Sequence, residues 1–103
     1  MTLSTHVLDT ARGEPAVGVP VRLDRADDAG WVAVASGVTD GDGRLRDWLP
    51  EAAWQRGVYR LVFSVDGEFF PEVTVAFRVA EPDRHYHVPL LLSPYGYTTY
   101  RGS

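Results

Sequence analysis

Hydrophobic residues recur at every second position in several short stretches of the chain. In "VPVRL", Val19, Val21 and Leu23 fall on one face of an extended strand and the residues between them on the other. The stretches "VYRLVFSV" (58–65) and "VTVAFRV" (73–79) alternate in the same way. A period of two predicts strands that bury one face in a core.

Turn-forming residues separate these stretches, in "ARGEP", "DRADDAG", "TDGDG", "VDGE" and "AEPD". Many short strands at this spacing are typical of an all-β sandwich. Asp66-Gly67, between two alternating runs, predicts a hairpin. The one helical candidate, "PEAAWQRG", is a turn or two long. The expected strands cover approximately 3–9, 19–24, 31–38, 44–48, 58–65, 72–79, 85–92 and 96–100.

Length and composition indicate a single globular domain, 1–103, since 45% of the residues are hydrophobic and 12% aromatic. The chain has no cysteine, which excludes disulfides, zinc–thiolate sites and thiol nucleophiles. A net charge of -4 with interspersed signs offers no basic stripe for nucleic acid. The longest apolar run, 88–92, is too short for a membrane span, and "MTLSTHVLDT" lacks signal-peptide features. We therefore expect a cytoplasmic protein.

All three histidines fall in predicted strands. His85 and His87 are two residues apart and share one face, while His6 lies in the first strand. Each can be a half-buried structural histidine. The His-x-His spacing also suits a metal ion, with His6 as a third ligand. The remaining interpretation is acid–base catalysis, because an imidazole titrates near neutral pH and can activate water.

Hydrolysis also needs a group that holds an anionic substrate or a developing oxyanion, which the guanidinium fork does well. Arg44 in "TDGDGRL" emerges from a Gly-rich turn, although a solvated arginine at the edge of a turn is the simpler interpretation. No Gly-x-Ser-x-Gly elbow surrounds Ser103, so its hydroxyl and terminal carboxylate suit binding or orientation better than nucleophilic attack. The nearby Tyr95, Tyr97 and Tyr100 are of a kind enriched at buried interfaces.

Three separated stretches together resemble the 5-hydroxyisourate hydrolases, the transthyretin-related enzymes of urate breakdown. They are "STHVLDTARGEPAVGVPVRL", "TDGDGRL" and "HYHVPLLLSPYGYTTYRGS". The final Tyr-Arg-Gly-Ser resembles the C-terminal signature that distinguishes these enzymes from the hormone carrier transthyretin. The resemblance extends over nearly the whole chain.

The resemblance implies a prealbumin-like sandwich of two four-stranded sheets, assembled as a homotetramer with active sites at the dimer–dimer interface. It implies hydrolysis of 5-hydroxyisourate to 2-oxo-4-hydroxy-4-carboxy-5-ureidoimidazoline without a metal or other cofactor. By the same resemblance, His6 and His87 activate and position water while Arg44 stabilises the developing negative charge. The residues expected to wall and orient the substrate are Tyr100, Arg101, Gly102 and Ser103.

The chain departs from the family's pattern in one place. Family members commonly carry about ten more residues, including a short helix, between the fifth and sixth strands, and such surface insertions are readily lost. Here "VFSVDGEFFPEV" closes this gap directly, so we expect the helix to be absent or reduced to a hairpin.

Three other functions fit parts of the pattern. A transthyretin-like carrier would use the same fold to bind a small aromatic ligand, without needing paired histidines or the C-terminal tetrapeptide. A structural or adhesive sandwich domain fits the strand pattern alone. A metal-dependent hydrolase would use the histidines as ligands.

Overall fold

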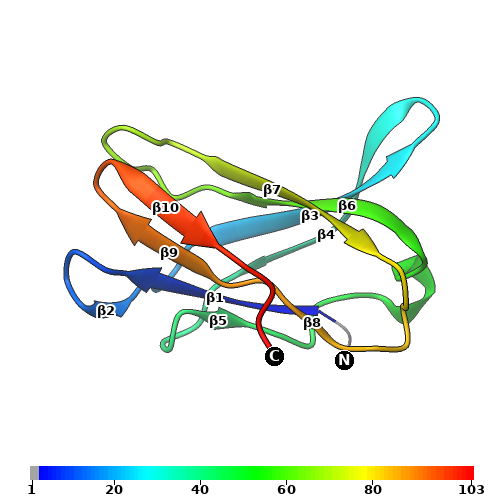
Figure 1. Ribbon diagram of the computed structural model, residues 1–103, viewed down its shortest axis with the longest axis horizontal. Helices are drawn as coiled ribbons and strands as arrows, with labels where there is room; N and C mark the ends of the chain where they lie inside the picture. The colour runs from blue at the N-terminus through cyan, green and yellow to red at the C-terminus, as the bar shows by residue number, and fades with distance from the viewer. Residues whose placement is uncertain (1–2) are drawn as a thin grey trace.

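The computed structural model describes residues 3–103, which form two β-sheets packed face to face (Figure 1). One sheet has the strand order β4-β3-β6-β7, and the other has the order β10-β9-β1-β2, with β5 and β8 also paired to β1. The strands are β1 (Leu3–Asp9), β2 (Glu14–Pro15), β3 (Pro20–Asp27), β4 (Gly30–Val38), β5 (Arg44–Leu45), β6 (Gly57–Phe63), β7 (Val73–Val79), β8 (Tyr86–His87), β9 (Leu90–Ser93) and β10 (Gly96–Thr99).

The predicted all-β sandwich is confirmed, although several strand boundaries differ from the expected ones. The strand expected at 85–92 is divided into β8 and β9 around Pro89, whose ring nitrogen has no hydrogen to donate to a ladder. The strand expected at 44–48 is only two residues long, because Asp47 adopts a left-handed conformation with φ of 55°. With the short β2 added, the second sheet contains six strands instead of the expected four.

The core between the sheets follows the alternation seen in the sequence. On β1, Leu3, Thr5 and Val7 are buried, while the residues between them are half-buried on the outer face of the sheet. The opposite sheet contributes Tyr59 and Phe63, which are fully buried. Full burial of a large apolar side chain stabilises the fold by about 1.5–3 kcal/mol, so this packing keeps β1 in register.

The predicted helical candidate forms a single 3₁₀ turn at Glu51–Ala53, just before β6. The Tyr59 hydroxyl ties this turn to the sheet, because it accepts the Gln55 N–H at 2.8 Å and lies 3.0 Å from the Ala53 carbonyl oxygen, to which it donates. The prediction of a short helical segment is therefore confirmed.

The connection between β6 and β7, residues 64–72, forms a hairpin and contains no helix, as expected. The closing turn of this hairpin runs from Gly67 to Phe70, so its centre lies two residues beyond the Asp66-Gly67 pair. The Gly67 N–H donates to the Phe70 carbonyl oxygen at 3.0 Å, and the Asp66 N–H donates to the Pro71 carbonyl oxygen at the same distance. A side chain at Gly67 would lie 2.6 Å from the Phe70 oxygen, so glycine is required there for close approach of the two arms.

Candidate active site

The outer face of β1 gathers most of the site. The antiparallel pairing of β1 with β5 places His6 opposite Arg44, and its parallel pairing with β8 places Ser4 opposite His87. Because Ser4 and His6 are two residues apart, their side chains leave the same face of the sheet. Four polar side chains from three strands are thereby brought together outside the core.

The turn before β5 fixes the position of Arg44. The Asp40 carboxylate accepts the backbone N–H groups of Asp42 at 2.9 Å and Arg44 at 3.0 Å. These two bonds hold the pKa of the Asp40 carboxyl below its usual range. Gly43 has φ of 75°, and a side chain there would lie 2.5 Å from the Val7 carbonyl oxygen. The "TDGDG" turn therefore needs both its aspartate and its second glycine in order to deliver Arg44 to β1.

A backbone carbonyl holds His6, whereas His85 and His87 share one serine hydroxyl. The Nε2–H of His6 donates to the Asp42 carbonyl oxygen at 2.9 Å, which leaves Nδ1 as the unprotonated nitrogen of the neutral ring. The Ser4 Oγ lies 2.7 Å from Nδ1 of His87 and 2.9 Å from Nε2 of His85. One serine hydroxyl thus links the two histidines of the His-Tyr-His segment.

The environment of His87 favours its neutral form. Burial is the largest cause that lowers its pKa, and the positive charge of Arg44 is the next, followed by His85 and His6. A hydrogen bond with the Ser4 backbone acts in the opposite direction. A neutral imidazole at neutral pH can accept a proton from water, as a general base must.

A cavity of about 190 Å³ opens beside these groups. It joins three of the residues predicted from the sequence, Arg44, His87 and Ser103, while His6 lies outside its lining and is paired with Arg44 across the strands. The complete lining comprises Ser4, Thr5, Arg44, Leu45, Arg46, His85, His87 and Ser103. Ser4, His85 and Arg46 are additions to the predicted site; the alternation that places Ser4 on the face of His6 was the available signal for the serine.

The C-terminal tetrapeptide divides into two parts. The Gly102 N–H donates to the His87 carbonyl oxygen at 2.8 Å and leads Ser103 into the cavity. Tyr100 and Arg101 instead line a separate cavity of about 220 Å³ beside β7, where the Arg101 guanidinium lies 4.6 Å from the centre of the Tyr86 ring. Within one chain, only Gly102 and Ser103 of the tetrapeptide lie beside His87.

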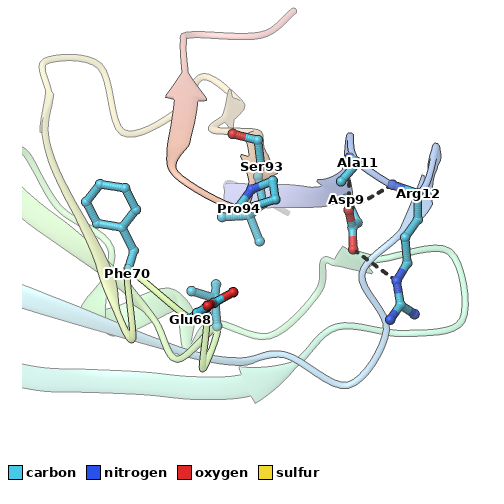
Figure 2. A pocket seen from close by; sticks show the side chains of 10 residues that line it. Asp9, Ala11, Arg12, Glu68, Phe70, Ser93 and Pro94 are labelled. Carbon is cyan, nitrogen blue, oxygen red and sulfur yellow. Dashed lines mark hydrogen bonds and ion pairs between the residues drawn. The ribbon is translucent and has the colours of Figure 1, made fainter.

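A larger cavity, of about 270 Å³, lies at the opposite end of β1 (Figure 2). Figure 2 shows Asp9 and Arg12 joined to one another on one side of it, with Phe70 and Glu68 of the β6–β7 connection on the other. Its lining contains no histidine, and its arginine is paired with a carboxylate, so it lacks the acid–base groups of the smaller cavity.

Among residues 3–103, no group of three or more histidine, cysteine, aspartate or glutamate side chains is arranged to hold a metal ion. The part of the chain that the structure describes also has no helix that is long and apolar enough to cross a membrane.

The fold and this cluster define a β-sandwich protein with a histidine–arginine site on the outer face of one sheet. The chain belongs to the HIUase/Transthyretin family, whose model matches residues 3–102. This assignment confirms the family resemblance predicted from the three sequence stretches.

Relatives from distant organisms support the assignment over nearly the full chain. A 5-hydroxyisourate hydrolase of Salmonella dublin is 47% identical, with 98% of this chain and 80% of that protein covered. A 5-hydroxyisourate hydrolase of Deinococcus radiodurans is 43% identical, with 98% of this chain and 95% of that protein covered. A probable 5-hydroxyisourate hydrolase of Caenorhabditis elegans is 40% identical, with coverages of 99% and 82%.

Solved structures share the architecture. Sea bream transthyretin, crystallised in complex with thyroxine, has a TM-score of 0.91 and 33% identity, with 99% of this chain and 95% of that chain covered. An (S)-allantoin synthase has a TM-score of 0.86 and 34% identity, covering 99% of this chain but 43% of its own. The same fold therefore occurs in a thyroxine-binding protein and in an enzyme.

Proposed function

We propose that this protein is a 5-hydroxyisourate hydrolase, which converts 5-hydroxyisourate to 2-oxo-4-hydroxy-4-carboxy-5-ureidoimidazoline in urate breakdown. The observation that carries the proposal is the meeting of His87 and Arg44 at one cavity, where a neutral imidazole lies beside a guanidinium. Family relatives that bear this activity in their names align with at least 98% of the chain.

Each residue has a proposed role in the reaction. His87 accepts a proton from the attacking water, and Arg44 binds substrate oxygens and stabilises the negative charge that develops on the attacked carbonyl. His6, whose Nε2–H is committed to the Asp42 carbonyl oxygen, helps to position the water. Gly102 and Ser103 orient the substrate beside His87, whereas Tyr100 and Arg101, which line the separate cavity of the same chain, do so across the interface between copies. A side-chain base and a guanidinium supply this chemistry, so we propose a reaction without a metal.

We also propose a homotetramer, a dimer of dimers, in which neighbouring copies close the cavity at the dimer–dimer interface. Edge strands β7 and β10 offer backbone groups for pairing with a second copy. The exposed fractions of Tyr95 and Tyr100 are 69% and 56%, and exposed aromatic side chains of this kind are enriched at interfaces. Sedimentation of the protein in solution tests the assembly: a monomer at micromolar concentration contradicts it.

The cytoplasmic location stays a prediction, for which cell fractionation is the test.

The second candidate is a small-ligand carrier, which the similarity to the thyroxine complex of sea bream transthyretin favours. A carrier would retain an aromatic ligand in the same region of the fold without turnover. Addition of the purified protein to freshly generated 5-hydroxyisourate separates the two candidates, because only the hydrolase accelerates the loss of the substrate's ultraviolet absorbance.

Steady-state kinetics on the same substrate test the proposed roles. We expect His87→Ala and Arg44→Ala each to lower kcat/KM on the order of a hundredfold or more, as the loss of an acid–base or charge-stabilising group ordinarily does. The matched control is Arg12→Ala, which removes an exposed arginine from the 270 Å³ cavity at the opposite end of β1 and should leave kcat/KM unchanged. Wild-type kcat/KM in His87→Ala or Arg44→Ala contradicts the proposal.

A further inference from the structure

Ser4 lies between two imidazole rings, and it has no role in the reaction as proposed above. Its Oγ lies within hydrogen-bond distance of Nδ1 of His87, at 2.7 Å, and of Nε2 of His85, at 2.9 Å. His87 is half-buried and His85 is exposed, and both line the cavity together with Ser4. The serine therefore connects the interior of the site to its solvent-facing rim.

The hydroxyl has one hydrogen, so it can donate to only one of the two nitrogens and must accept from the other. In one arrangement, Nδ1–H of His87 donates to Ser4, and Ser4 donates to Nε2 of His85. In the reverse arrangement, Ser4 donates to Nδ1 of His87, and the neutral ring then carries its hydrogen on Nε2. The tautomers of the two histidines are consequently coupled through Ser4.

Only the first arrangement makes His87 a base at Nε2. The Ser4 hydroxyl engages Nδ1 of His87, at 2.7 Å. With the hydrogen on Nδ1, the lone pair of Nε2 is available to a water molecule. Ser4 thereby determines which nitrogen of His87 can act on the substrate.

We propose that Ser4 and His85 form a proton relay with His87. As water forms a bond to the carbonyl carbon of the substrate, its proton moves to Nε2 of His87, and the carbonyl electron pair moves to the oxygen facing Arg44. The Nδ1 proton passes to Ser4 Oγ, and the Ser4 hydroxyl proton passes to Nε2 of His85. When the carbon–nitrogen bond breaks, the protons return along the same path and the leaving nitrogen takes one from Nε2 of His87. Ser4 and His85 are positioning residues, and the relay rests on the proposed hydrolase function.

Kinetics of matched variants test the relay. We expect Ser4→Ala and His85→Gln to lower kcat on the order of tenfold or more with little change in KM, because proton transfer is impaired while the substrate contacts persist. Ser4→Thr keeps the hydroxyl in a strand position that suits a β-branched residue, so it should restore most of kcat. Ser36→Ala, on an exposed position of β4 in the other sheet, is the control. Unchanged kcat in Ser4→Ala, or no rescue by Ser4→Thr, contradicts the relay.

A second measurement does not depend on turnover. Nitrogen-15 NMR of the free protein should show neutral His87 with its hydrogen on Nδ1, and Ser4→Ala should shift the ring toward the Nε2–H tautomer. Wild-type His87 with its hydrogen on Nε2 overturns the relay whatever the activity. A wild-type protein that shows the Nδ1–H tautomer but does not turn over 5-hydroxyisourate overturns the proposed function instead, and with it the catalytic use of the relay.

Discussion

Gly102 and His87 form an antiparallel bridge that holds the C-terminal tail against the candidate base. The Gly102 N–H donates to the His87 carbonyl oxygen at 2.8 Å, and the glycine faces the edge of the imidazole ring. A Cβ atom at this position would lie 2.5 Å from Cδ2 of His87, closer than real contacts allow. The third residue of the tetrapeptide is therefore glycine for a steric reason.

We predict that Gly102→Ala lowers kcat/KM on the order of tenfold or more while leaving the fold intact. The added methyl group must displace either the imidazole ring or the tail, and small misplacements of a catalytic group are costly. Gly41→Ala is the control, because a Cβ there meets nothing within 4 Å and the backbone does not require a left-handed conformation. Equal kcat/KM in wild type and Gly102→Ala contradicts the steric argument.

Removal of residues 100–103 should abolish most of the activity with little effect on stability. The deletion removes the bridge to His87 and takes Ser103 out of the cavity, yet no residue of the core is lost. Kinetics and thermal unfolding of the shortened protein provide the measurement. A tail that merely frayed would be dispensable, so full activity without these residues would remove their proposed role.

The pH dependence of kcat/KM should report the depressed pKa of His87. As the pH rises through that pKa, the base loses its proton and kcat/KM rises. Because the pKa lies below the ordinary 6.5, the profile should already be level near neutrality. An acid limb centred above 6.5 contradicts this prediction.

Arg44 should be one cause of that depression, since its positive charge opposes protonation of His87. In an NMR titration of the His87 ring, the midpoint should therefore move to higher pH in Arg44→Gln. Arg12→Gln, a change at the distant cavity, should leave the midpoint in place. A midpoint unaffected by Arg44→Gln would show that Arg44 does not contribute and that burial and the other two histidines cause the depression.

An ionic network on the other sheet should contribute to stability. The side chain of Asp24 is 3% exposed, and its two carboxylate oxygens each lie 2.8 Å from a guanidinium Nε, one of Arg22 and one of Arg60. We expect Asp24→Asn to lower the free energy of unfolding at neutral pH by about 1–3 kcal/mol, as loss of a hydrogen-bonded charged partner does. Asp27→Asn, at an exposed position of the same strand, is the control.

Acid should remove the difference in stability between wild type and Asp24→Asn. The Arg22 hydrogen bond is the largest cause that holds the pKa of Asp24 below its usual value, so the folded state favours the carboxylate more than the unfolded state does. The contribution is complete above the ordinary carboxyl pKa of 3.8 and is lost as the pH falls through the lower folded-state value. Urea unfolding of wild type and Asp24→Asn across this pH range measures the contribution. A difference in unfolding free energy that stays constant with pH contradicts the role given to the Asp24 carboxylate.

Much of the architecture was predictable because it depends on local alternation and turns. The period of two predicts that Val21 and Leu23 share a buried face, and "TDGDG" predicts the turn that delivers Arg44. The division of the 85–92 strand was missed because the effect of Pro89 depends on which backbone groups the neighbouring strand offers. Likewise, the end of the β6–β7 hairpin depends on the pairing of Gly67 with Phe70, which dipeptide preference alone does not determine.

The site was predictable in its residue types and only partly in its geometry. Resemblance supplied His6, Arg44, His87 and the tail, and the structure places Arg44 and His87 at one cavity. The link through Ser4 requires the parallel pairing of β1 with β8, between residues 83 positions apart, and no local pattern predicts such a contact. The orientation of Arg101 toward the Tyr86 ring is equally a matter of tertiary packing.

The pairing of β1 with β8 and β9 has a consequence for the order of folding. Ser4 meets His87 only after a loop of more than 80 residues has closed, and the entropy of that closure must be paid before the contact stabilises anything. The β3–β4 and β6–β7 hairpins join residues much closer in the chain and can form earlier. Recovery of activity during refolding would thus require the first strand to dock onto the last ones, a step for which the local hairpins can already be in place.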